Sequence, residues 1–237
     1  MKYLLNNFSV KEHIQRALIE DIGFGDITTD SIYDENYLVK AVVNSRSEGI
    51  ICGIDIVKAV YEILDPAIKF NALLKDGDKI AKNQDLAIIE GSCRTILSGE
   101  RVALNYIQRM SAIATLANKY QEAVKPYKTK VVDTRKTTPG FRIFEKYAVI
   151  TGGAYLHRFN LSDCIMLKDN HIQYMGSINA AVEKVRQKSS HVHKIEVEVE
   201  TLEQVKEALN VNVDIIMLDN MSIEEMKEAV NLINNKA

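Results

Sequence analysis

The chain has 237 residues, of which 46% are hydrophobic and 26% are charged, so it can bury a hydrophobic core in one or two domains of about 150 residues. The charged fraction argues against disorder, and a formal net charge of −2 provides no basic field for nucleic acid. No apolar run approaches the roughly 18 residues of a membrane span, and the N-terminus lacks the apolar segment of a signal peptide. We therefore expect a globular, cytoplasmic protein that binds neither nucleic acid nor membranes.

The first half of the chain mixes helices with strands that do not alternate regularly with them. In chain order the sequence predicts a helix at 10–20, a turn-rich stretch at 21–30, a strand at 37–44, a helix at 53–64, strands at 68–74 and 86–89, and a long helix at 95–124. Pro126 ends the long helix. This order favours a small α+β domain, which we place at residues 1–107.

Beyond Pro126 the sequence predicts strands that alternate with helices. The predicted strands lie at 130–133, 164–167, 194–199 and 214–218, and the predicted helices at 141–150, 178–187, 202–209 and 223–233. Alternating units of this length predict a parallel, barrel-like sheet. We assign residues 108–237 to this second domain.

Ionisable side chains occur where each predicted strand of the second domain ends, which is where active sites lie in such folds. The stretch from Asp133 to His171 carries six Lys or Arg residues and four Asp or Glu residues, whereas the chain from Lys194 onward carries four and ten. A barrel would place a cationic wall opposite an acidic one. The two walls either pair in a solvated ion network, or a ligand with several anionic groups and a metal completes them.

The acidic wall has a regular pattern. Glu196, Glu198 and Glu200 alternate with apolar residues, so the three carboxylates share one face of a strand. In a barrel this face points inward. Glu198 and Asp219, on adjacent strands, can together hold Mg²⁺ or the hydroxyl groups of a sugar.

These residues form motifs that resemble the quinolinate phosphoribosyltransferase family, also called nicotinate-nucleotide pyrophosphorylase (carboxylating). The matches follow one another along most of the chain. They are the runs Glu20–Thr29, Gly99–Asn105, Asp133–Gly140 (DTRKTTPG), Glu145–Val149, His157–Arg158, Lys168–Ile172 (KDNHI), Glu196–Val199 and Leu218–Asn220.

The resemblance implies an α/β fold in which an N-terminal α+β sandwich-like domain precedes an open, incomplete α/β barrel. It also implies a homodimer, or a hexamer, with active sites at the subunit interface. The implied reaction joins quinolinate to 5-phosphoribosyl 1-pyrophosphate in the presence of Mg²⁺. Its products are nicotinate mononucleotide for de novo NAD biosynthesis, CO₂ and pyrophosphate.

The resemblance also assigns roles to individual residues. Substrate binding falls to Arg101, Thr134, Arg135, Lys136, His157, Arg158, Lys168, Glu198 and Asp219. Within this set, Arg101 is the arginine that the partner subunit contributes. The cationic wall for quinolinate consists of Arg135, His157, Arg158 and Lys168.

The catalytic roles are carried by part of the same set. Lys136 and Lys168 are expected to meet the phosphoribosyl pyrophosphate, while Glu198 and Asp219 are the acidic pair near the ribose. The same pair is expected to bind Mg²⁺ carried by that co-substrate. No general base is required.

The sequence departs from the family pattern at several points. Ala112 and Ala154 stand where glycine is usual, and Leu156 stands where asparagine is usual. Four predicted strands follow Pro126, so we expect the last barrel strands to be missing. The alternatives are therefore a truncated, weakly active or non-catalytic relative, and a molybdenum-transport-associated paralogue that acts on another small acid.

Overall fold

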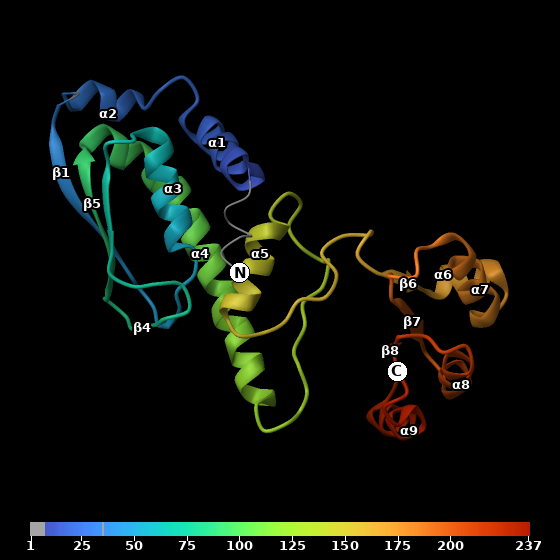
Figure 1. The fold of residues 1–237 in the computed structure, drawn as a ribbon. Helices are drawn as coiled ribbons and strands as arrows, with labels where there is room; N and C mark the ends of the chain where they lie inside the picture. Colours follow the sequence, from blue (N-terminus) through green and yellow to red (C-terminus); the bar gives the residue numbers. More distant parts are fainter. Residues whose placement is uncertain (1–7, 35) are drawn as a thin grey trace. The chain divides into compact units, whose positions relative to one another are not determined.

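A computed structural model describes residues 8–34 and 36–237. The chain divides into two compact units, one ending at His157 and one running from Arg158 to Ala237 (Figure 1). Among the described residues, no helix is both long enough and apolar enough to pass through a bilayer.

The N-terminal unit combines antiparallel strands with helices. Its elements are α1 (Phe8–Ile22), α2 (Ile27–Ile32), β1 (Leu38–Asn44), β2 (Gly49–Ile50), α3 (Ile54–Leu64), β3 (Lys69–Ala72), β4 (Lys79–Ile80), β5 (Asp85–Ser92), α4 (Cys93–Val124) and α5 (Arg142–Thr151). Strands β1, β5 and β3 form one antiparallel sheet in that order, and β2 pairs with β4. The predicted helices and strands up to residue 124 are confirmed, while the domain boundary predicted after residue 107 lies inside α4 and stays a prediction.

Helix α2 corrects the turn predicted at 21–30. The turn ends at Gly25, and the Asp26 side chain then caps the helix by accepting a hydrogen bond from the Thr29 N–H (3.0 Å). Hydrogen bonding to Thr29 lowers the pKa of Asp26, because it favours the ionised carboxylate. The prediction was wrong for the last residues of the stretch, since Asp26 is an N-cap signal.

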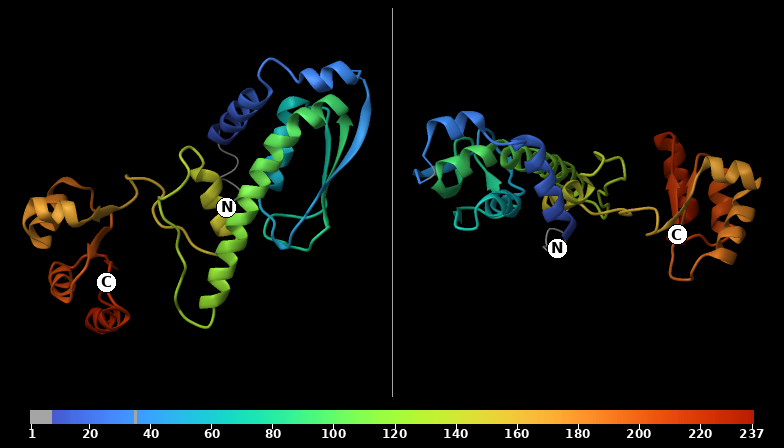
Figure 2. Two further views of the ribbon diagram at one scale, coloured as in Figure 1. Left: turned by 180° about the vertical axis from the view of Figure 1, so that it is seen from behind. Right: turned by 90° about the horizontal axis from the view of Figure 1, so that it is seen from above.

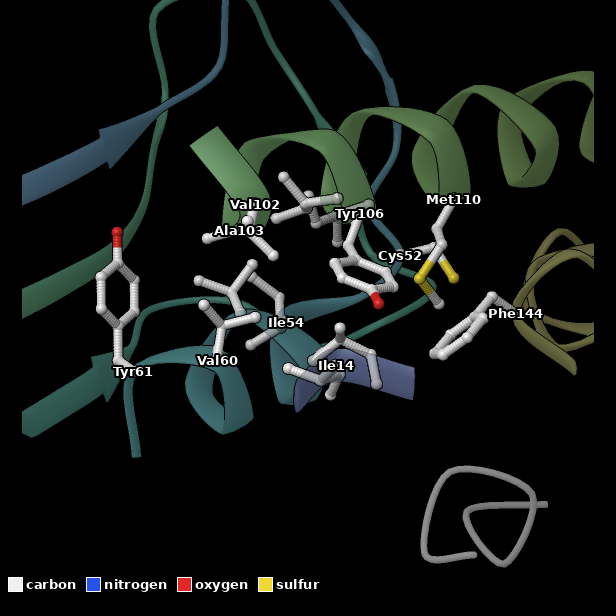
Figure 3. Packing of buried hydrophobic residues seen from close by; sticks show 14 of the residues in the cluster. Ile14, Cys52, Ile54, Val60, Tyr61, Val102, Ala103, Tyr106, Met110 and Phe144 are labelled. Atoms are coloured by element: carbon white, nitrogen blue, oxygen red, sulfur yellow. The ribbon is translucent and has the colours of Figure 1, made fainter. Parts of the chain in front are cut away.

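The core of the N-terminal unit lies along α4. Its side chains Val102, Tyr106 and Met110 face Ile14 of α1 and the helix α3, as Figure 3 shows, and all are buried. Phe144 of α5 joins this cluster and packs against the ring of Tyr106 with a centroid distance of 5.1 Å. Helix α4 is therefore the element to which α1, α3 and α5 are all attached.

The end of α5 packs closely against α4. A Cβ atom at Gly152 would lie 2.3 Å from the carbonyl oxygen of Ala114, and Gly153 has a φ of +91°. Both positions therefore require glycine. Ala112 lies within α4, and Ala154 is not among the non-glycine residues of positive φ in the described part of the chain. These alanines introduce no backbone strain.

The C-terminal unit is a parallel sheet with helices. Its elements are β6 (Ile165–Leu167), α6 (Asp169–Met175), α7 (Ile178–Lys188), β7 (Ile195–Val199), α8 (Leu202–Asn210), β8 (Ile215–Leu218) and α9 (Ile223–Ile233). Strand β7 lies between β6 and β8, and both views in Figure 2 show the helices beside these strands. Ile195, Val197 and Val199 pack in one core with apolar residues of α7, α8 and α9. The predicted strands and helices are confirmed, and α6 is an addition.

The strand predicted at 130–133 is reduced to a single parallel bridge between Val132 and Tyr155. Tyr155 N–H donates to the Val131 carbonyl (2.8 Å), and Asp133 N–H donates to the Tyr155 carbonyl (3.1 Å). The next N–H in line, that of His157, donates to the carboxylate of Asp133 instead of a backbone carbonyl (2.8 Å). A side chain thus ends the ladder, which is why the strand prediction was wrong.

Candidate active site

Three of the predicted site residues lie at the C-terminal ends of the parallel strands of the C-terminal unit. Lys168 follows β6, Glu198 lies near the end of β7 and Asp219 follows β8. The register pairs Leu167 with Val197, and Glu198 with Met217. Because side chains alternate along strands, Lys168, Glu198 and Asp219 share the face opposite the apolar core. The structure therefore brings them together at the carboxyl ends of the strands.

Lys168 and Glu198 form an ion pair between the Lys168 Nζ and the Glu198 Oε2. The Glu198 side chain is 17% exposed and that of Lys168 is 43% exposed. The N–H of Lys168 donates to Nδ1 of His171 (3.0 Å), which fixes the start of α6. An ammonium group held beside a half-buried carboxylate can turn to an incoming anion without leaving its partner.

Asp219 is held at the same level by its backbone, since its N–H donates to the Val199 carbonyl (2.9 Å). Its carboxylate accepts a hydrogen bond from the Asn220 side chain (3.1 Å), which also donates to Glu200 (3.0 Å). Asn220 has a φ of +52°, a conformation that asparagine tolerates better than most residues. Glu196 is buried, whereas Glu200 is exposed at the open end of the face.

Arg158 lies at the start of the C-terminal unit. Its guanidinium donates to the Cys164 carbonyl (3.4 Å) and approaches the sulfur of Met166 (3.1 Å). A carbonyl and a thioether leave the positive charge of Arg158 without a carboxylate partner in these two contacts, so the group suits an anionic ligand.

The remaining cationic residues belong to the loop after the Val132 bridge. Thr134 and Lys136 are exposed, and the Thr134 hydroxyl accepts a hydrogen bond from the Lys136 N–H (3.0 Å). The Arg135 carbonyl accepts from the N–H of Thr137 (2.9 Å) and from the guanidinium of Arg142 (3.4 Å). The loop backbone is thus ordered by its own hydrogen bonds.

Arg135 carries the clearest mark of a binding site. Its Nε is buried and has no hydrogen-bond partner anywhere in the described ranges. A buried donor without an acceptor costs free energy, and native proteins seldom leave one outside a functional site. An anion placed on this guanidinium would satisfy it.

Two residues that sequence reasoning left without a role organise His157. Lys146 of α5 is fully buried and donates to both carboxylate oxygens of Asp133, each at 2.7 Å. Lys146 also donates to the His157 carbonyl (3.3 Å). The available signal was a lysine beside aromatic and small residues, between Phe144 and Ala148 of α5.

Arg101 belongs to helix α4 of the N-terminal unit. It is exposed on α4 and lines a groove of about 1010 Å³ between this helix and the β1–β5 sheet. Polar side chains from both sides, among them Arg46, Glu100 and Gln108, line the groove with apolar ones. None of the other predicted site residues borders it.

The described part of the chain holds no group of three or more His, Cys, Asp or Glu side chains arranged for a metal ion. Glu198 and Asp219 are two carboxylates on one face. This set suits Mg²⁺, which proteins commonly hold with one or two carboxylates together with phosphate oxygens of a substrate.

Comparison with known proteins identifies the family. Residues 26–111 match the family model described as quinolinate phosphoribosyl transferase, N-terminal domain, and residues 113–237 match the model of the C-terminal domain. A probable nicotinate-nucleotide pyrophosphorylase [carboxylating] of Bacillus subtilis is 45% identical over 216 residues, covering 91% of this chain and 74% of the relative. A protein of the same name from Methanocaldococcus jannaschii is 40% identical, covering 98% and 80%.

Solved structures agree with this assignment. The crystal structure of NadC from Streptococcus pyogenes matches with a TM-score of 0.93 and 41% identity, covering 100% of this chain and 82% of that one. The nicotinate-nucleotide pyrophosphorylase from Francisella tularensis matches with a TM-score of 0.92 and 39% identity, covering 97% and 81%. With both family models matched and relatives well above 30% identity, the chain belongs to the quinolinate phosphoribosyltransferase family.

Proposed function

We propose that this chain is the quinolinate phosphoribosyltransferase of de novo NAD biosynthesis. It transfers the phosphoribosyl group of 5-phosphoribosyl 1-pyrophosphate to quinolinate and releases pyrophosphate and CO₂, leaving nicotinate mononucleotide. The observation that carries the proposal is the buried, unpartnered Nε of Arg135 within the matched DTRKTTPG motif. A guanidinium with an unused donor is suited to a carboxylate.

Quinolinate carries two adjacent carboxylates, so its site needs several fixed cations. We assign this role to Arg135, His157, Arg158 and Lys168, with Arg101 supplied by a partner subunit. The guanidinium of Arg158, which contacts a carbonyl and a sulfur, supports the assignment. Planar guanidinium groups also match the geometry of carboxylates.

Phosphoribosyl transfer forms a bond from the pyridine nitrogen to C1 of the ribose, while the bond from C1 to the pyrophosphate oxygen breaks. Positive charge develops on the ribose as pyrophosphate leaves. We assign its electrostatic stabilisation to Glu198 and Asp219, which share a face of the sheet. Thr134, Lys136 and Lys168 bind the phosphate groups. Glu198 and Asp219, together with phosphate oxygens of the co-substrate, would hold Mg²⁺, which would offset the negative charge of the phosphates.

Decarboxylation breaks the bond between the ring and the carboxylate beside the nitrogen. CO₂ leaves, the electron pair stays on the ring carbon, and a proton from solvent replaces the carboxylate. The ring nitrogen, now bonded to ribose and positively charged, stabilises that electron pair. The positive charges of the cationic wall for quinolinate add to this stabilisation.

The finer architecture belongs to the same proposal. We propose that the two parts of the chain form an N-terminal sandwich-like domain and an open α/β barrel, and that two chains assemble so that each receives the other's Arg101. The exposed position of Arg101 in a groove that none of the other predicted site residues borders supports donation across an interface.

The activity is tested by incubating the purified chain with quinolinate, 5-phosphoribosyl 1-pyrophosphate and Mg²⁺. We expect nicotinate mononucleotide and pyrophosphate in equal amounts. Removal of Mg²⁺ with a chelator should stop the reaction, because the phosphates of the co-substrate then lose their counter-ion. Absence of product with intact quinolinate binding would instead identify a non-catalytic relative.

Donation of Arg101 is tested by mixing two inactive variants, Arg101→Ala and Glu198→Ala. In a randomly exchanged two-fold dimer, about a quarter of the wild-type activity should return, because half of the dimers are mixed and each contains one intact site. A mixture of Glu198→Ala and Lys168→Met is the matched control. It should stay inactive, since both changes affect residues that one chain supplies. No recovery in a verified mixed dimer would assign Arg101 to its own chain's site.

A further inference from the structure

The ion pair of Asp133 and Lys146 is more deeply buried than the ion pair of Lys168 and Glu198. The side chains of Lys146 and Asp133 are 0% and 8% exposed. The pair joins two separate segments to α5: the first residue of the DTRKTTPG motif, and the segment that ends the N-terminal unit at His157. The pair thus connects the start of the loop that carries Arg135 to the segment that carries His157.

Both backbone groups of His157 are held by this pair. The His157 N–H donates to Asp133 Oδ1 (2.8 Å), and the His157 carbonyl accepts from Lys146 Nζ (3.3 Å). In a regular parallel ladder the N–H would donate to the Asp133 carbonyl. The Asp133 carboxylate replaces the Asp133 carbonyl as the acceptor. The two backbone segments can therefore separate here while the His157 N–H keeps a hydrogen bond.

The hydrogen bonds of Lys146 and the cost of burying charge bear on why the pair is present. The Lys146 ammonium has three donors, and these find both oxygens of Asp133 and the His157 carbonyl. Burial of an ion pair seldom stabilises a fold more than well-packed apolar residues of the same size would. Fold stability alone therefore does not account for an ion pair at this position, whereas fixing the backbone of a substrate-binding residue does.

We infer that Asp133 and Lys146 are positioning residues for quinolinate: they touch no substrate, and they fix the direction in which His157 presents its side chain. The inference rests on the proposed function, in which His157 and Arg158 bind quinolinate and not the phosphoribosyl co-substrate. Positional errors of about 1 Å in such a site can cost a hundredfold in rate.

The test is the double variant Asp133→Leu with Lys146→Met, which removes every hydrogen bond of the pair without leaving a buried charge unpaired. We expect a melting temperature within about 5 °C of wild type. The KM for quinolinate should rise roughly tenfold to a hundredfold, and that for phosphoribosyl pyrophosphate should change by less than about threefold. Tyr147→Phe is the matched control. It removes one buried hydrogen bond from the same helix, to Asp76 (2.9 Å), and leaves His157 untouched.

The outcomes separate the inference from the proposed function. An active wild type whose double variant keeps its quinolinate KM overturns the positioning role and leaves the function standing. Equal increases in both KM values, or the same increase in Tyr147→Phe, also overturn it, because they indicate a general loss of order. If the double variant does not fold, Lys146→Gln must show the same selective increase. A wild type without activity refutes both ideas.

Discussion

Replacing Arg135 with alanine should weaken quinolinate binding roughly a hundredfold. The guanidinium has a buried donor without a partner, which the carboxylate of the substrate would satisfy. Losing a charge-assisted hydrogen bond costs about 3 kcal/mol, or roughly a hundredfold in affinity. Titration calorimetry with quinolinate alone measures this effect apart from catalysis.

The stability of the same variant provides an independent check. Because the buried Nε has no acceptor in the free protein, Arg135→Ala should not lower the melting temperature and can raise it. Quinolinate at a hundred times the wild-type Kd should stabilise the wild type by about 2.7 kcal/mol and the variant by only about 0.4 kcal/mol. Arg135→Lys is the matched control, since it keeps the charge and loses the planar fork, and it should show intermediate affinity. Unchanged affinity in Arg135→Ala would place quinolinate elsewhere.

The second large effect is expected from Glu198→Gln. The substitution keeps the shape of the side chain and removes the negative charge that faces the developing cation on the ribose. Because that cation exists only in the transition state, kcat should fall by about 10² to 10³ while the KM for quinolinate changes little. Steady-state kinetics with both substrates separates the two parameters.

The ion pair with Lys168 makes a double-mutant cycle informative. If the pair acts as a unit, Glu198→Gln combined with Lys168→Met should lose much less activity than the product of the two single losses. Glu200→Gln is the control. Glu200 shares the face of Glu198 by alternation, is exposed, and accepts a hydrogen bond from Asn220, so its loss should leave kcat near wild type. A fall in kcat of less than threefold in Glu198→Gln would remove Glu198 from the catalytic step.

Much of the fold follows from local signals that are legible in the sequence. The helix predicted at 223–233 has the bounds Ile223–Ile233 because Ser222 accepts a hydrogen bond from the Glu225 N–H (3.2 Å) and Asn234 ends the helix in the left-handed conformation. Alternation in 195–200 likewise predicts which side chains of β7 meet the helices. Caps and periodicity are properties of neighbouring residues, so one sequence suffices to find them.

Long-range pairing is where prediction from one sequence ends. The segment 130–133 has the composition of a strand, yet its ladder stops after one bridge because the Asp133 carboxylate competes for the His157 N–H. Lys146 is buried against expectation, since lysine is among the residues least often buried without a partner. Its partner lies 13 residues away, and neither residue alone reveals the pair.

We propose that one site of this protein couples phosphoribosyl transfer to loss of the carboxylate beside the ring nitrogen. The most direct measurement supplies quinolinate labelled in that carboxylate. It compares the amount of labelled CO₂ with the amounts of nicotinate mononucleotide and pyrophosphate. We predict equal amounts of all three in the wild type, and a far lower amount of each in Arg135→Ala at the same quinolinate concentration. Pyrophosphate released without labelled CO₂, or no product from a protein that binds both substrates, would contradict the account.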